Sequence, residues 1–281
     1  MKILKTISEI RVFLREKRRL GRSIGLVPTM GALHDGHLSL LKASVEENDI
    51  SVVSIFVNPT QFNNQEDFEK YPLHIEEDLE KLSKNKCDVV FLPDQGEIYR
   101  DKTRLKFHFG SLEKVMEGKF RPGHFNGVAI IVSKLFNIIQ PDTAYFGQKD
   151  LQQFTIIKLL NEQLDFGIKL RCMPIMREPN GLAMSSRNLR LSSAGIETAS
   201  IIYKIINKSA ELLLTGNSIS NVKSFVENEF KNSEARLEYF EIVSLIDMKS
   251  IRKIKSGEEC ALCIAAYVED VRLIDNTLLT L

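Results

Sequence analysis

The chain has no tryptophan, only four cysteines and almost no net charge. Its 38 lysines and arginines nearly balance 37 aspartates and glutamates, and the resulting charge of +1 argues against a large nucleic-acid interface, which needs a strongly basic face. No apolar run approaches the roughly 20 residues of a membrane span, so we expect no membrane partner. Residues 1–5 lack the features of a secretory signal, and we therefore expect a cytoplasmic protein.

The cysteines form no recognisable metal or redox framework. Cys260 and Cys263 have C-x-x-C spacing, but they lie in an apolar, strand-like run over residues 260–268. Residues three apart in a strand point to opposite faces, and no second close pair completes a tetrahedral zinc site. We expect buried, reduced thiols that pack as small hydrophobic side chains.

The first 175 residues alternate between apolar, strand-like runs and helical stretches. Strands are expected over residues 24–27, 50–57, 89–92, 143–146 and 168–173, and helices over residues 37–47, 75–85, 127–139 and 150–163. Continuous apolar strands separated by helices predict an α/β fold, with a parallel sheet covered on both faces. Ligands of such sheets bind at the carboxyl ends of the strands, where we expect loops to begin at Pro28, Asn58 and Gly147.

From residue 176 onward the pattern changes. Two helices are expected over residues 193–214 and 219–231, followed by strands over residues 237–245, 260–268 and 271–274. A hairpin turn at Glu269-Asp270 would join the last two strands. Helices followed by adjacent antiparallel strands predict a smaller α+β domain, so we divide the chain into residues 1–175 and 176–281.

The stretch from Thr29 to His37 reads T-M-G-A-L-H-D-G-H and follows the first of these apolar runs. A strand, a glycine-bearing loop and a helix in succession present backbone N–H groups to a phosphate. His34 and His37 can face the same side where the helix begins, and two imidazoles there can stabilise charge during nucleotidyl transfer. The stretch resembles the H-x-G-H motif of the nucleotidyl-transferase superfamily. A solvated loop with two incidental histidines is the other interpretation.

Four further polar segments have both a functional and an ordinary interpretation. Residues 58–63 place amides after a strand, which suits a hydroxyl or carboxylate substrate but also an Asn-Pro turn. Residues 121–125 form either an anion contact or a helix cap. Residues 147–150 bring a lysine to a strand-to-helix junction, where it can approach a polyphosphate. Residues 184–188 combine hydroxyls with a guanidinium, a set that suits β- and γ-phosphates or a surface loop.

Taken in order, these segments resemble the pantothenate synthetase family. The matching stretches are V-P-T-M-G-A-L-H-D-G-H, V-S-I-F-V-N-P-T-Q-F, R-P-G-H-F-N-G-V, M-R-E-P-N-G-L-A-M-S-S-R-N and, near the C-terminus, D-V-R-L-I-D-N. The resemblance implies a Rossmann-like N-terminal domain that binds ATP and pantoate, with a smaller C-terminal lid, usually in a homodimer. It also implies ATP-dependent condensation of pantoate with β-alanine through a pantoyl-adenylate, giving pantothenate, AMP and pyrophosphate.

The resemblance assigns roles to particular residues. ATP contacts are expected at Met30, Gly31, Ala32, Leu33, His34, Asp35, Gly36, His37, Gly147, Gln148, Lys149, Asp150, Met176, Met184, Ser185, Ser186 and Arg187. The catalytic residues among them are expected to be His34, His37, Lys149 and Arg187. The substrates pantoate and β-alanine would be held by Gln61 and Gln153, with Asn58 helping to position that site.

A second group of residues concerns charge around the ATP phosphates. Glu117 and Arg121 match a phosphate-side or metal-side pair. Mg²⁺ is expected to accompany ATP, held mostly by phosphates and water, with a weaker contribution from Glu77 or Asp78. One departure from the family is Leu73, which follows Tyr71-Pro72 where an arginine is usual. We expect it to leave the chemistry intact, because every phosphate-side motif is present.

Three alternatives remain open at this stage. Another H-x-G-H enzyme, such as an aminoacyl-tRNA synthetase, would need an anticodon-binding region and usually a basic surface. A nucleotidyltransferase acting on a phosphate acceptor would lack the glutamine-based carboxylate site. A non-catalytic ATP sensor would not require the histidines, Lys149, Ser185 and Arg187 together.

Overall fold

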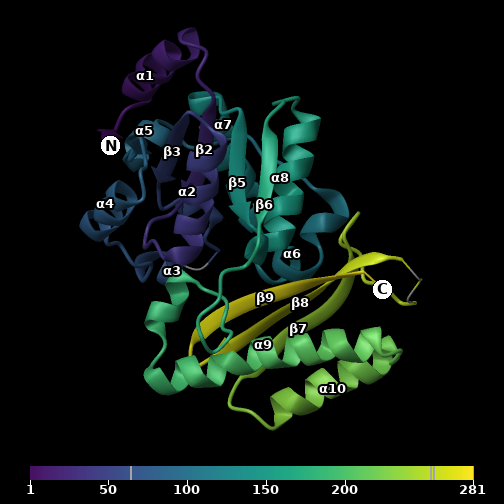
Figure 1. Cartoon of the computed structure of the whole chain (residues 1–281). Coiled ribbons are helices and arrows are strands. Elements are labelled where there is room, and N and C mark those ends of the chain that lie inside the picture. Colours follow the sequence, from purple (N-terminus) through teal and green to yellow (C-terminus); the bar gives the residue numbers. More distant parts are fainter. Residues whose placement is uncertain (64, 254, 256, 281) are drawn as a thin grey trace. The chain divides into compact units, whose positions relative to one another are not determined.

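The computed structural model describes residues 1–63, 65–253, 255 and 257–280. The chain forms two compact units (Figure 1). The first comprises residues 1–113, 117–148 and 152–174, and the second comprises residues 114–116, 149–151 and 175–281.

A six-stranded parallel sheet forms the centre of the first unit. Its order is β1 (Lys2–Leu4), β4 (Val89–Phe91), β3 (Ile50–Ile55), β2 (Ile24–Thr29), β5 (Thr143–Gly147) and β6 (Lys169–Met173). The helices up to residue 174 are α1 (Ile7–Arg19), α2 (Asp35–Glu47), α3 (Gln65–Glu69), α4 (Ile75–Lys84), α5 (Gln95–Ile98), α6 (Met116–Phe120), α7 (His124–Ile139) and α8 (Leu151–Gln163). The described residues in this range also form the short 3-10 helices η1 (Pro59–Gln61), η2 (Gly110–Glu113) and η3 (Gln148–Asp150).

The sheet buries apolar side chains on both of its faces, as the continuous apolar strands predict. Leu26 of β2 packs in one core with Leu14 of α1 and Phe136 of α7. The next residue, Val27, packs in a second core with Leu41 of α2. Successive strand residues point to opposite faces, so this division confirms a sheet covered on both sides.

Two local features of this unit differ from the sequence expectations. The sequence pattern did not indicate β1 or α1, although α1 begins with a capping box in which Thr6 and Glu9 bind each other's backbone N–H. In addition, β2 continues to Thr29. Pro28 therefore lies inside the strand, and the loop begins two residues later than expected.

The second unit is the expected small α+β assembly. Its antiparallel sheet has the order β7 (Arg236–Ser244), β8 (Glu259–Val268) and β9 (Val271–Thr280), and η4 (Ser186–Arg190) precedes its helices. These helices, α9 (Ser193–Leu214) and α10 (Ile219–Lys231), share one apolar core with the strands. The predicted turn at Glu269-Asp270 joins β8 to β9. β9 extends beyond the predicted residues 271–274, because its polar residues remain paired with β8.

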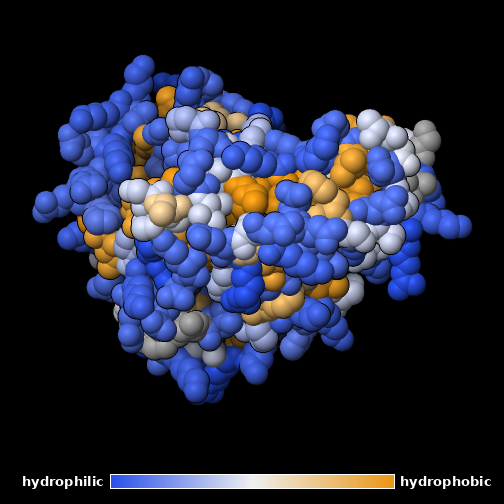
Figure 2. All heavy atoms as spheres, turned by 90° about the horizontal axis from the view of Figure 1, so that it is seen from below, coloured by the Kyte–Doolittle hydropathy of each residue, from blue (hydrophilic) through white to orange (hydrophobic). Residues whose placement is uncertain are grey.

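Cys260 and Cys263 are buried thiols in the core strand β8, as expected, whereas Cys172 is exposed. Within the described residues, no group of three His, Cys, Asp or Glu side chains could hold a metal ion. The same part of the chain contains no helix that is long and apolar enough to cross a membrane. Figure 2 shows a face that is mainly hydrophilic, crossed by an interrupted band of hydrophobic residues.

Candidate active site

His34 and His37 lie side by side at the first turn of α2, with ring centroids 4.1 Å apart. His34 is the N-cap, and its Nδ1 accepts the N–H of Gly36 at 3.2 Å. The backbone N–H of His34 in turn donates to Nδ1 of His37 at 3.4 Å. Because both Nδ1 atoms act as acceptors, the proton of each neutral ring is on Nε2. Both imidazoles can therefore donate a hydrogen bond from Nε2 at a helix N-terminus.

The loop before α2 is held by helix α4. Gly31 and Ala32 both have positive φ, so this loop needs external support. The carboxylate of Asp78, which is fully buried, accepts the N–H groups of Ala32 at 2.8 Å and Leu33 at 2.7 Å. One turn further along α4, Lys81 Nζ donates to the carbonyl of Leu33 at 2.7 Å. The loop before the H-x-G-H segment is thus held by two charged side chains of α4, Asp78 and Lys81, which we call the clamp.

These contacts change the interpretation of Asp78. The sequence suggested Asp78 as a weak magnesium ligand, but its two oxygens are both occupied by backbone amides in a site without solvent exposure. Asp78 is therefore an anchor of the loop. Its neighbour Glu77 is exposed.

Strand β3 is adjacent to β2, and the turn that follows β3 is organised by Asn58. This buried carboxamide donates to Gln61 Oε1 at 3.1 Å and to the Gly127 carbonyl at 3.2 Å. Its oxygen accepts the hydroxyls of Thr60 at 2.9 Å and Tyr99 at 2.7 Å. Burial raises the pKa of Tyr99 above its usual value. Asn58 therefore positions Gln61 through bonds made within the protein.

Gln61 also connects two of the predicted segments. Its Nε2 donates to Met30 Sδ at 2.8 Å, which joins it to the loop after β2. Its backbone carbonyl accepts Nδ1–H of His124 at 2.8 Å, and His124 Nε2 accepts from Arg121 at 3.1 Å. Arg121 forms an ion pair with Glu117 at 3.6 Å. The pair expected near the phosphates thus supports the backbone of Gln61.

The two adjacent glutamines of α8 have different environments. Gln152 is buried, where its Oε1 accepts the N–H of Glu117 at 2.9 Å and its Nε2 donates to the Leu112 carbonyl at 2.7 Å. Gln153, the predicted pantoate contact, is half-buried. Gln152 is therefore a structural residue, and the side chain of Gln153 is the one suited to meet a ligand.

Strand order brings these segments of the first unit together. The loops after β2 and β3 follow neighbouring parallel strands. On the other side of β2, Gly147 is the last residue of β5 and Gln148 follows it, so this loop begins one residue later than expected. After β2 the chain continues to β3 on one side of β2 in the sheet, whereas β5 lies on the opposite side of β2. A ligand crevice of an α/β sheet forms at such a reversal, at the carboxyl ends of the strands.

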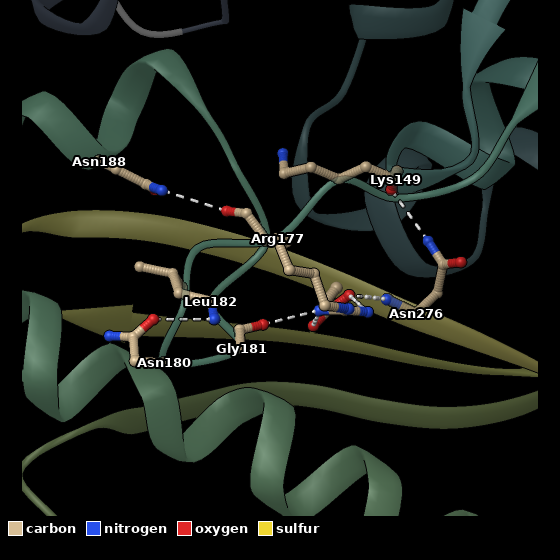
Figure 3. Close-up of polar contacts among 9 residues, drawn as sticks. Lys149, Arg177, Asn180, Gly181, Leu182, Asn188 and Asn276 are labelled. Atoms are coloured by element: carbon tan, nitrogen blue, oxygen red, sulfur yellow. Dashed lines mark hydrogen bonds and ion pairs between the residues drawn. The ribbon is translucent and has the colours of Figure 1, made fainter. Parts of the chain in front are cut away.

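In the second unit, Arg177 is held by contacts with three residues, and Figure 3 shows its hydrogen bond to Gly181. Its guanidinium donates to both oxygens of Asp275, at 2.7 and 3.0 Å, and to the Gly181 carbonyl at 3.1 Å. It also lies 4.2 Å from the ring centroid of Tyr203 on α9. A Cβ at Gly181 would collide with that ring, so a glycine is required for this packing. Burial raises the pKa of Asp275, and Arg177 opposes this shift.

The segment held by Arg177 leads directly to the expected phosphate contacts. The N–H of Met184 donates to the carbonyl of Met176 at 3.0 Å, which closes a narrow hairpin. Ser185 then caps η4, where its hydroxyl accepts the N–H of Arg187 at 3.3 Å. Ser186 is buried, while Ser185 and Arg187 are partly exposed. The hydroxyl and the guanidinium therefore occupy one preformed turn.

A model of the pantoate-beta-alanine ligase family matches residues 2–278. The chain belongs to the pantoate-beta-alanine ligase family. It is 47% identical over 280 residues to a pantothenate synthetase from Cytophaga hutchinsonii, with 98% of each chain covered. A pantothenate synthetase structure from Thermus thermophilus has a TM-score of 0.92 at 34% identity, with 99% of each chain covered. A Francisella tularensis pantoate-beta-alanine ligase, complexed with beta-gamma ATP and beta-alanine, has a TM-score of 0.83 at 37% identity, covering 99% of this chain and 97% of that one.

Some residues that shape the site of this ligase were not found from the sequence. No sequence pattern indicated that Tyr99 or Tyr203 belongs to the site, because each lies far along the chain from the segment that it supports. Asp275 and Asn276 belong to the matching stretch D-V-R-L-I-D-N, but nothing in that stretch indicated a role. Leu73, the residue expected to depart from the family pattern, is exposed between α3 and α4.

Proposed function

We propose that this enzyme makes pantothenate in two steps through a pantoyl-adenylate. The chain is a pantoate-beta-alanine ligase, which uses ATP to join pantoate to β-alanine in pantothenate biosynthesis. The observation that carries the placement of pantoate beside ATP in this proposal is the hydrogen bond from Gln61 to Met30. This hydrogen bond uses one of the two N–H donors of the half-buried Gln61 amide and holds it beside the loop that leads into the paired histidines, and the second N–H can donate to a substrate oxygen.

The first step converts the pantoate carboxylate into a better electrophile. A carboxylate oxygen bonds to the α-phosphorus of ATP, the bond from that phosphorus to the bridging oxygen of the β-phosphate breaks, and pyrophosphate leaves. This displacement needs no proton transfer, so His34 and His37 serve to stabilise charge from Nε2–H. Lys149 and Arg187 neutralise the phosphates that leave, and Ser185 donates to them.

In the second step the neutral amine of β-alanine attacks the acyl carbon of the mixed anhydride. AMP leaves, the amine loses a proton, and an amide bond forms. Gln61 and Gln153 hold pantoate throughout, and Asn58 orients Gln61. Holding the amine close to the activated acyl group supplies most of the rate acceleration that this step requires.

Mg²⁺ is proposed to enter with ATP, held by its phosphates and by water. Asp78 is already used by the loop, so of the two carboxylates expected near the metal only the exposed Glu77 stays in this proposal. From the family resemblance we further propose residues 1–175 as the domain for ATP and pantoate, residues 176–281 as a lid, and a cytoplasmic homodimer. Light scattering measures the oligomeric state.

Exchange of labelled pyrophosphate into ATP tests the order of events. With ATP, Mg²⁺ and pantoate but no β-alanine, the enzyme should exchange label, because adenylation is reversible. Exchange should disappear without pantoate, and an amino acid should not replace it, which separates this enzyme from an aminoacyl-tRNA synthetase. Exchange that required β-alanine would contradict the two-step proposal and indicate a concerted reaction.

A further inference from the structure

Two polar residues, Asp275 and Asn276, lie next to each other in β9 and are both buried, with 4% and 3% of their surfaces exposed. Burial of polar groups costs free energy unless each finds a hydrogen-bond partner. Successive strand residues point to opposite faces of the sheet. Asp275 and Asn276 can therefore each bind a different segment of the chain, one on each face of the sheet. The hydrogen-bond partners of the two residues indicate their roles.

Asn276 holds the main chain of Lys149. Its Nδ2 donates to the Lys149 carbonyl at 3.0 Å, and its own N–H donates to Asp275 Oδ1 at 2.7 Å. In Figure 3 the carboxamide of Asn276 points at this carbonyl, while the Lys149 side chain extends in another direction. The contact joins positions 127 residues apart in the sequence. The fold thus fixes the backbone from which the Lys149 ammonium reaches.

Asp275 fixes the other phosphate-side segment of the same unit. Its ion pair with Arg177 anchors the start of the hairpin that ends at residues 184–187. Both oxygens of Asp275 are used by Arg177, and Oδ1 also accepts from Asn276. The ion pair therefore stiffens the strand position from which Asn276 reaches Lys149.

We propose that Asn276 is a positioning residue for the adenylation step, acting through Lys149. A lysine ammonium is a point charge on a flexible stem of four carbons, so the backbone must be fixed if the charge is to meet a phosphate reproducibly. Misplacement of a catalytic group by about 1 Å can cost about a hundredfold in rate. The inference rests on the proposed function of Lys149 at the ATP phosphates.

The test is Asn276→Leu, which keeps a similar volume but removes the donor. We expect its maximal rate of pantoate-dependent pyrophosphate exchange to fall by about tenfold to a hundredfold, with the KM for pantoate unchanged. Asn217→Leu is the matched control, because that carboxamide also donates to a backbone carbonyl in the same unit, at the end of α9. If Asn276→Leu does not fold, Asn276→Ala also removes the donor and introduces no charge.

A double-mutant cycle distinguishes positioning from general support of the fold. If Asn276 acts through Lys149, then adding Asn276→Leu to the Lys149→Ala variant should cause no further loss of pyrophosphate exchange rate. Additive losses would overturn the inference, as would an Asn276→Leu variant that exchanges like Asn217→Leu while Lys149→Ala is impaired. A Lys149→Ala variant with normal exchange would instead contradict the proposed function.

Discussion

His34 and His37 form a reciprocal cap in which each imidazole accepts a backbone N–H of the same turn. The arrangement is a capping box built from histidines instead of the usual serine and glutamate. It sets the orientation and the tautomer of both rings before any ligand arrives. A histidine pair that depended on solvent for its orientation would have to be ordered again in each catalytic cycle.

Because His34 caps the helix through Nδ1, a substitution can separate its capping role from its proposed catalytic role. Asparagine is a strong N-cap residue, so His34→Asn should keep the melting temperature close to that of the parent protein. It removes the Nε2–H donor, and we expect pyrophosphate exchange to fall by about a hundredfold or more. Thermal unfolding and exchange measured on one preparation provide the check. Normal exchange would mean that His34 only caps the helix.

Replacement of Lys149 by alanine should lower turnover by about a hundredfold or more in a protein that stays folded, because a preorganised charge at the phosphates is lost. Steady-state formation of AMP, with circular dichroism as the check on folding, gives the measurement. Lys158→Ala is the matched control, since Lys158 is an exposed lysine of α8. Equal activity of the two variants would refute the phosphate role of Lys149.

Gln61→Ala and Gln153→Ala should weaken pantoate binding far more than ATP binding. Each amide is expected to meet a substrate oxygen, and a partner left unsatisfied costs about 1–3 kcal/mol. The apparent affinities of both substrates are to be measured for each variant, with Gln163→Ala at the exposed end of α8 as control. Equal weakening of pantoate and ATP would argue against a dedicated pantoate site.

Asp78→Asn should weaken the support of the loop that leads into the H-x-G-H segment. One of its two backbone amides would then face an NH₂ group, at a cost of about 1–3 kcal/mol in the free energy of unfolding. We also expect adenylation to slow, because the loop leads directly into His34. Denaturant unfolding and pyrophosphate exchange test both effects, with the exposed Glu80→Gln on the same helix as control. A variant with normal stability and normal exchange would show that the clamp is dispensable.

The parallel sheet and the histidine pair could be predicted because both are encoded locally. Strands buried on both faces need continuous apolar runs, and a three-residue spacing places two side chains on one side of a helix turn. In contrast, β1 has only three residues and depends on pairing with β4, which a local pattern cannot show. The polar pair Asp275-Asn276 ended the apolar run, so β9 was predicted too short.

The support of the site was less predictable than its candidate contact residues. Asp78 was suggested as a weak metal ligand because Mg²⁺ prefers carboxylate and other oxygen ligands. Its actual partners, Ala32 and Leu33, are more than forty residues away in sequence. Asn58 could be placed near the pantoate contacts, but its bonds to Tyr99 and Gly127 depend on helices that pack from elsewhere.

The close approach of α7 to the turn after β3 has a consequence for substrate affinity. A side chain at Gly127 would collide with the carbonyl of Thr60, so helix and turn touch backbone to backbone. Helix α7 is among the most buried elements of the first unit, and the turn cannot shift without disturbing it. The turn that bears Gln61 is thus ordered by folding alone. Under the proposed function, the binding of pantoate at Gln61 therefore carries no conformational-entropy cost for ordering this turn.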